Sequence, residues 1–110
     1  MTLAFGPKYD AEGAYFEKAS GSALVYGLDW SGWLTEAGGL TVSSSTWSGD
    51  AGITVTPSAI SGGVTSALIS GGTVGQTYWI TNTIGASDSV QSDSASFRIV
   101  VVERKSLKAA

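Results

Sequence analysis

The sequence predicts an all-β protein, namely an immunoglobulin-like antiparallel β-sandwich of about six to seven strands with an N-terminal arm. Apolar and polar residues alternate with a period of two in several short segments, as in strands that bury one face. Clusters of glycine and serine separate these segments at intervals of about 8–12 residues, which is typical of turns between sandwich strands. No long segment shows the 3.6-residue apolar period of a helix.

Four predicted strands lie in the N-terminal two thirds of the chain. They span residues 22–28, 40–47, 53–56 and 64–70. The third ends before Pro57, because proline has no backbone N–H to donate to a neighbouring strand. The fourth alternates between two faces, and we expect Thr65, Ala67 and Ile69 to point outward.

The last two predicted strands, residues 76–84 and 94–102, have the clearest alternation. In the first of them a row of threonines and Trp79 opposes an inner face, which consists of Tyr78, Ile80, Asn82 and Ile84. In the second, the inner face consists of Ala95, Phe97, Ile99 and Val101. We expect the two strands to pair as a hairpin with these faces together.

The expected organisation has three parts. Residues 1–21 mix charged and aromatic side chains without the alternation and form an N-terminal arm. Residues 22–104 form the sandwich, and residues 105–110 form an exposed, basic C-terminal tail.

Composition excludes many kinds of chemistry. The chain has no histidine and no cysteine, so it lacks the usual general base, the thiolate nucleophile and the commonest zinc ligands. The spacing of an EF-hand calcium loop is also absent. We therefore expect a protein that is not an enzyme and that has no cofactor and no metal.

Two classes of partner are also disfavoured. A net charge of −3 opposes binding to the phosphate backbone, so we expect no nucleic acid partner. The longest apolar run, residues 99–102, is far shorter than the roughly 20 residues that span a bilayer. The first residues do not resemble a secretory signal, so no membrane partner and synthesis in a cytoplasm are expected.

Aromatic residues are the strongest candidates for contacts. Trp30 and Trp33 flank a Ser-Gly pair, and Trp79 projects from a threonine-rich strand face. Tryptophan suits both core and binding surfaces, so each of the three either caps the core or contacts a partner. Tyr9, Tyr15 and Phe16 are the corresponding candidates in the arm.

Two other uses remain open. Exposed tryptophans with Ser, Thr and Asp nearby can stack against sugars and hydrogen-bond to them, which is typical of a carbohydrate-binding module. A glycosidase needs only two carboxylates, and three pairs are near in sequence: Asp10 with Glu12, Asp29 with Glu36, and Asp88 with Asp93. Each pair is equally consistent with ordinary solvated loop charges.

Four segments carry a resemblance to a known family. They are LDWSGWL at 28–34, GLTVSSS at 39–45, LISGGTVGQTY at 68–78 and SFRIVV at 96–101. Across residues 24–104 this pattern resembles the small immunoglobulin-like virion proteins of tailed bacteriophages, which include fibre–tail adaptors and minor structural proteins. Residues 1–21 have no counterpart in that pattern.

The resemblance implies a non-enzymatic virion protein that docks a fibre or another component onto the tail or neck. It implies other virion proteins as partners, several copies in a symmetric assembly, and a virion location after synthesis in the host bacterial cytoplasm. The contact residues expected for this role are Tyr9, Tyr15, Phe16, Trp30, Trp33 and Trp79. The alternative is a capsid-decorating or carbohydrate-binding β module.

Overall fold

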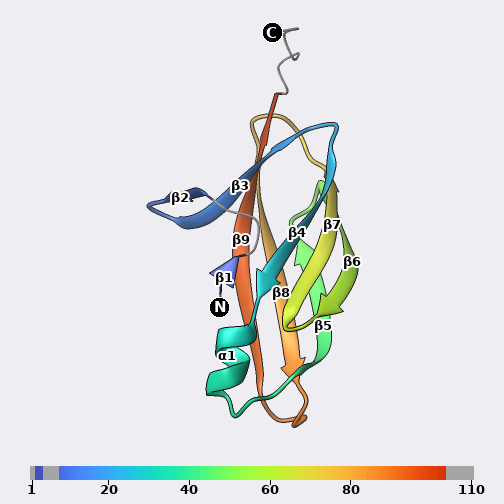
Figure 1. The fold of residues 1–110 in the computed structure, drawn as a ribbon. Coiled ribbons are helices and arrows are strands. Elements are labelled where there is room, and N and C mark those ends of the chain that lie inside the picture. The colour runs from blue at the N-terminus through green and yellow to red at the C-terminus, as the bar shows by residue number, and fades with distance from the viewer. Residues whose placement is uncertain (1, 4–7, 104–110) are drawn as a thin grey trace, which may run out of the picture.

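The computed structural model describes residues 2–3 and 8–103, which form nine strands and one short helix (Figure 1). The elements are β1 (Thr2–Leu3), β2 (Lys8–Asp10), β3 (Gly13–Ala19), β4 (Ala23–Asp29), α1 (Ser31–Glu36), β5 (Val42–Gly49), β6 (Ile53–Ser61), β7 (Val64–Gly71), β8 (Thr77–Ala86) and β9 (Ser92–Val102). The predicted C-terminal tail, residues 105–110, lies outside the described residues.

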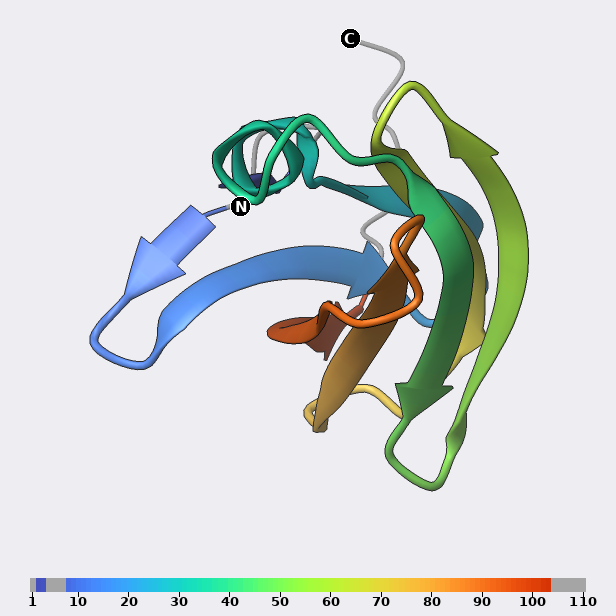
Figure 2. The same cartoon turned by 90° about the horizontal axis from the view of Figure 1, so that it is seen from below.

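The strands form two sheets, with the order β1-β4-β7-β6 in one and β2-β3-β9-β8-β5 in the other. Figure 2 shows the two layers facing each other, with the β5–β6 turn at one side. When β3 to β9 are lettered A to G, one sheet contains strands B, E and D, and the other contains C, F and G together with A. Immunoglobulin domains divide strands B, E and D from C, F and G in the same way. All strand pairs are antiparallel except β3 with β9. The predicted all-β sandwich is confirmed.

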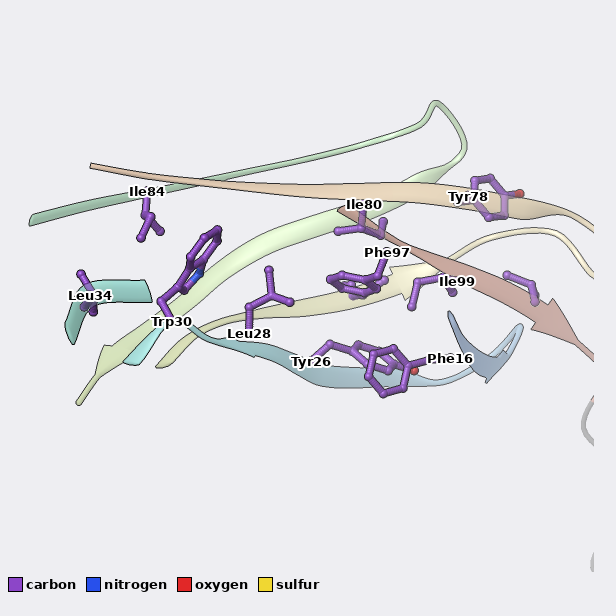
Figure 3. Close-up of a cluster of buried hydrophobic side chains, with 12 residues drawn as sticks. Phe16, Tyr26, Leu28, Trp30, Leu34, Tyr78, Ile80, Ile84, Phe97 and Ile99 are labelled. Carbon is purple, nitrogen blue, oxygen red and sulfur yellow. The ribbon is translucent and has the colours of Figure 1, made fainter. Parts of the chain in front are cut away.

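The core fills the space between the sheets (Figure 3). Phe16, Tyr26 and Phe97 form an aromatic group at its centre, with ring centroids 4.8–6.4 Å apart. The buried branched residues around it are Leu28, Leu34, Ile69, Ile80, Ile84, Ile99 and Val101. Complete burial of a side chain of this size contributes about 1.5–3 kcal/mol, so this layer supplies the main stabilisation of the sandwich.

The C-terminal hairpin is confirmed in partners and in faces. β8 and β9 pair over nine residues, from Thr77 opposite Val100 to Gly85 opposite Ser92. The predicted inner residues Tyr78, Ile80, Asn82 and Ile84 are all buried. Trp79 and the threonines of β8 lie on the opposite face, as their alternation requires.

The expected orientation of residues 64–70 is wrong. Thr65, Ala67 and Ile69 are fully buried, whereas Leu68 is partly exposed. The central position of β7 between β4 and β6 decides this, because its register places Ala67 opposite the buried Tyr26. Local hydropathy cannot show which face of such a strand meets the second sheet.

The third predicted strand continues beyond its expected end. β6 runs from Ile53 to Ser61 and passes through Pro57, with a register shift between Pro57 and Ala59. β6 is an edge strand whose one neighbour is β7. A proline is tolerated at an edge or a bulge because no second strand needs its missing N–H.

The expected arm is placed differently by the structure. Residues 13–19 form β3, which pairs in parallel with β9 from Tyr15 opposite Arg98 to Ala19 opposite Val102. Phe16 and Lys18 of β3 are buried. β2 pairs with β3 and extends it into a hairpin that projects from the body of the sandwich (Figures 1 and 2). The weak alternation of β3 hid it in the sequence, because Lys18 occupies an inward position.

The segment around Trp30 and Trp33 contains α1, a helix that the sequence analysis did not predict. Asp29 Oδ1 accepts hydrogen bonds from the backbone N–H of Ser31, at 2.9 Å, and from its hydroxyl, at 2.6 Å. These bonds hold the pKa of Asp29 below its ordinary value. At the other end, the Gly38 N–H donates to the Thr35 carbonyl at 3.2 Å and the Gly39 N–H donates to the Leu34 carbonyl at 3.0 Å. Both glycines have a positive φ, of +119° and +77°, and together they end the helix.

Candidate interaction site

Trp30 is a core residue with a polar anchor. Its indole is fully buried, and Nε1 donates to Asn82 Oδ1 at 3.0 Å and to Thr65 Oγ1 at 3.2 Å. Asn82 Nδ2 in turn donates to the Ser45 hydroxyl and to the Thr46 carbonyl, both at 2.9 Å. The network therefore joins the end of β4 to β7, β8 and β5.

The six predicted contact residues differ in exposure. Trp30 and Phe16 belong to the core, and Trp33 is half-buried with its ring edge-on to Trp30 at 6.0 Å. Tyr9 and Trp79 are 69% and 42% exposed. Tyr15 is partly exposed and lies on the outer face of β3. The structure brings Tyr15 and Trp79 together but leaves Tyr9 at the projecting hairpin.

An arginine lies between Tyr15 and Trp79 on the outer face of the larger sheet. Tyr15, Arg98 and Trp79 are neighbours on β3, β9 and β8. The guanidinium carbon of Arg98 is 5.2 Å from the Tyr15 ring centroid and 5.7 Å from that of Trp79. These distances are within the range of cation–π attraction. We call these three residues the aromatic–arginine row.

The β2–β3 hairpin supplies the counter-charges of Arg98. Asp10 accepts from both terminal nitrogens of the guanidinium, at 3.1 Å for Nη1, and the Gly13 carbonyl accepts from Nη2 at 3.0 Å. Glu12 lies 3.6 Å from Nη1. The bonds from Arg98, followed by the N–H of Glu12, hold the pKa of Asp10 below its ordinary value. Asp10 likewise raises the pKa of Arg98, which is only 5% exposed.

Small hydroxyl residues form rows beside the aromatic–arginine row. Thr81 and Ser96 are opposite each other on β8 and β9, with their hydroxyl oxygens 2.8 Å apart. Thr83 and Ser94 form the next pair, at 2.7 Å. Ser48 and Thr46 continue the two rows onto β5. The outer face of β5, β8 and β9 is therefore uncharged along these two rows.

A groove runs between β5 and β6, at the side where the two sheets part. One section, of about 400 Å³, lies against α1 and includes Leu34, Leu40 and Val42 in its lining. The other, of about 270 Å³, is lined by Trp47, Pro57 and neighbouring small residues. Ile60 of β6 borders both sections. Residues 51–87 contain no charged side chain, so the β6 wall is uncharged throughout.

In each of the three carboxylate pairs noted in the sequence, at least one member has a structural partner. Asp10 and Glu12 face Arg98, and Asp29 accepts hydrogen bonds from Ser31, the first residue of α1. Asp88 accepts from the backbone N–H groups of Val90 and Gln91 in the β8–β9 loop, which lowers its pKa. Within residues 2–3 and 8–103, no cluster of three or more acidic residues is arranged to hold a metal ion. In the same part of the chain, no helix has the length and apolarity to cross a membrane.

Fold and surfaces together define the class of protein: a small all-β sandwich domain with an aromatic–arginine row on the outer face of its larger sheet and an uncharged edge groove. The comparison with protein families then identifies the family. Residues 18–100 match the Gp77 family, described as podophage GP4 fiber-tail adaptor protein gp77, and the chain belongs to this family. The search of curated proteins returned no match. The resemblance seen in the sequence is therefore confirmed.

Arg98 is the residue that sequence reasoning missed. The alternation of the strand places Arg98 on the face opposite the inner residues Phe97 and Ile99, and that face is correct, but the hairpin and two aromatic rings cover its side chain. The sequence signal that could have pointed to Arg98 was the presence of an arginine in a strand with few other charged residues. Its acidic partners are more than 80 residues away in the chain, so spacing alone could not pair them.

Proposed function

We propose that this protein is a non-enzymatic structural component of a podophage virion that docks a fibre or another component onto the tail. The observation that carries the proposal is the family match over residues 18–100. The same match supports a virion location, and symmetric tails would require several copies. Most of the carboxylates discussed above have structural partners, which is consistent with a role in assembly.

The uncharged groove between β5 and β6 is the docking surface that we infer. Its wall strand β6 has a free edge, and its Ile60 side chain is 49% exposed between two hollows. An extended segment of a partner could pair with a free strand edge while placing apolar side chains in the hollows. The absence of charge on β6 favours a partner segment that is also uncharged.

The projecting β2–β3 hairpin is a second contact that we infer. Tyr9 at this hairpin is the most exposed tyrosine or tryptophan side chain described. Residues 8–17 precede the part of the chain that matches the family, so this hairpin is suited to a contact specific to this chain. Trp33 belongs to α1, the helix that borders the groove, and is a further contact residue that we propose.

The docking proposal is tested by co-assembly. Ile60→Lys places a charge between the two hollows, and we expect it to abolish co-elution of the full chain with tail or fibre proteins of its own virion in size-exclusion chromatography. Val90→Lys is the matched control, because Val90 is 83% exposed in the β8–β9 loop and does not line the groove. Normal assembly of the Ile60→Lys variant would reject the groove. A wild-type chain that binds no tail or fibre protein would reject the adaptor role.

The alternative of a capsid-decorating module predicts a different position in the particle. Electron microscopy of virions that carry a labelled chain distinguishes the two roles. Because the natural chain has no cysteine, a single introduced cysteine at residue 90 allows specific labelling. Label at the tail supports the adaptor, and label distributed over the capsid supports the alternative.

A further inference from the structure

Trp79 presents a large aromatic side chain on a polar sheet face. It is 42% exposed, although it lies on an internal strand of the larger sheet, between β9 and the β5–β6 turn. Arg98 approaches this ring, and Asp10 and Glu12 compensate the arginine charge. The ring is thus held in place next to a cation whose charge is already neutralised.

Asp50 adds a hydrogen-bond acceptor beside the ring. Its Oδ2 atom accepts the backbone N–H of Trp79 at 2.9 Å, and its own N–H donates to the Trp79 carbonyl at 3.1 Å. These two bonds fix the carboxylate next to Trp79. Within the described residues, no group donates a hydrogen bond to its second oxygen, Oδ1, and Asp50 is exposed.

The nearest hydroxyl row completes a set of polar groups. Thr81 and Ser96 lie one row from Trp79 and share a hydrogen bond of 2.8 Å. In such a pair, one hydroxyl donates to the other, so a further hydrogen and several lone pairs remain for a ligand. The oxygens of adjacent hydroxyls on a sugar ring have a similar spacing, so the pair is complementary to a sugar edge.

We propose that Trp79, Asp50, Thr81 and Ser96 form a binding site for a neutral glycan. The C–H face of one sugar ring stacks on Trp79, and its hydroxyls donate to Asp50 Oδ1 and exchange hydrogen bonds with the Thr81–Ser96 pair. Aromatic platforms with a few placed polar groups are the usual composition of small-ligand sites. The neutralised Arg98 and the uncharged rows favour a neutral sugar over an acidic one.

This site lies on the outer face of β8 and β9, whereas the proposed docking groove lies between β5 and β6. The two proposals are therefore independent. A protein surface is the other occupant that such a face could take, because Trp, Tyr and Arg are frequent in protein interfaces. The hydroxyl rows and the free carboxylate oxygen favour the glycan, and the experiment separates the two.

The test is a binding measurement with the full chain. Neutral glucan, galactan and mannan oligosaccharides and matched uronic acid oligosaccharides are titrated by calorimetry. We expect a neutral oligosaccharide to bind, and we expect Trp79→Ala to weaken that binding at least about tenfold. Asp50→Asn and Thr81→Val should each weaken it several-fold, while Trp79→Phe retains part of it. Val90→Ala and Ile60→Lys are the controls and should bind as the wild type does.

Three results would overturn the proposal. They are an absence of neutral oligosaccharide binding by the folded wild type, equal binding by Trp79→Ala, and stronger binding of the acidic series. Loss of virion-protein binding in Trp79→Ala, without glycan binding by the wild type, would assign this face to a protein partner. Near-ultraviolet circular dichroism verifies that each variant is folded.

Discussion

The indole Nε1 of Trp30 donates a 3.0 Å hydrogen bond to Oδ1 of Asn82 inside the sandwich, where both side chains are completely buried. Trp30 follows β4 in one sheet, and Asn82 belongs to β8 in the other. This bond therefore connects the two sheets in the buried interior, where polar groups are almost always hydrogen-bonded.

Removal of Asn82 should destabilise the protein strongly. Asn82→Ala deprives the Ser45 hydroxyl and the Thr46 carbonyl of their donor and leaves a cavity beside Trp30. We expect the free energy of unfolding to fall by about 2–4 kcal/mol. Urea denaturation followed by tryptophan fluorescence measures this change. Thr83→Ala on the exposed face is the control and should change it by no more than about 0.5 kcal/mol.

The Asp10–Arg98 pair should make the stability depend on acid pH. The folded-state pKa of Asp10 is lower than the ordinary value of 3.8, so the pair contributes fully above that value and its contribution is lost as the pH falls through the folded-state pKa. Asp10→Asn should consequently lose less stability than the wild type as the pH falls below about 4. Denaturation midpoints across these pH values provide the comparison. Parallel curves for the two proteins would show that the pair does not hold the hairpin.

Buried Lys18 should make the stability depend on alkaline pH as well. Its Nζ atom donates to the carbonyls of Gly71, at 2.7 Å, and Ala19, at 2.8 Å, and burial lowers its pKa from 10.5. The unfolded chain then binds more protons than the folded one, so stability should rise with pH between the folded-state pKa and 10.5. In Lys18→Met this rise should be absent. Lys8→Met, at an exposed site, serves as the comparison and should keep it.

The start of the folded unit can be tested by truncation. A chain that begins at Ser22 loses β3, including Phe16, whose ring contacts Tyr26 and Phe97. Loss of such a ring costs about 3–5 kcal/mol, so we expect this chain to be unfolded or severely destabilised by circular dichroism. A chain that begins at Gly13 keeps β3 and should remain folded. Equal melting temperatures of the Ser22 chain and the full chain would contradict this role of β3.

Two glycines in the loop between β7 and β8 form a matched pair. Gly72 and Gly75 have φ of +92° and +87°, so alanine is strained at both. A Cβ at Gly72 would lie 2.6 Å from Val101 Cγ2, whereas nothing lies within 4 Å at Gly75. Gly75→Ala should cost about 1 kcal/mol, and Gly72→Ala distinctly more, about 2–4 kcal/mol. Thermal unfolding of the two variants should show this order, and the reverse order would mean that Val101 moves aside freely.

Strand alternation in β8 and β9 was sufficient to predict their pairing, because these strands are adjacent in the chain and bury one face each. The same rule gave the wrong face for β7. Its position between two strands is a property of the assembled sheet, so the nearby hydropathy of Thr65 and Leu68 could not determine it.

The sequence by itself determined the all-β class, the strand-rich C-terminal half, the lack of histidine and cysteine chemistry, and the family. Tertiary structure decided which aromatic residues are accessible. Trp30 and Trp33 are three residues apart, yet one is sealed by the second sheet and the other only half-covered. Tertiary structure also brought Asp10 to Arg98 and Asp50 to Trp79. Such contacts depend on the parallel β3–β9 pairing and on the β5–β6 turn, because the strand order places distant segments side by side.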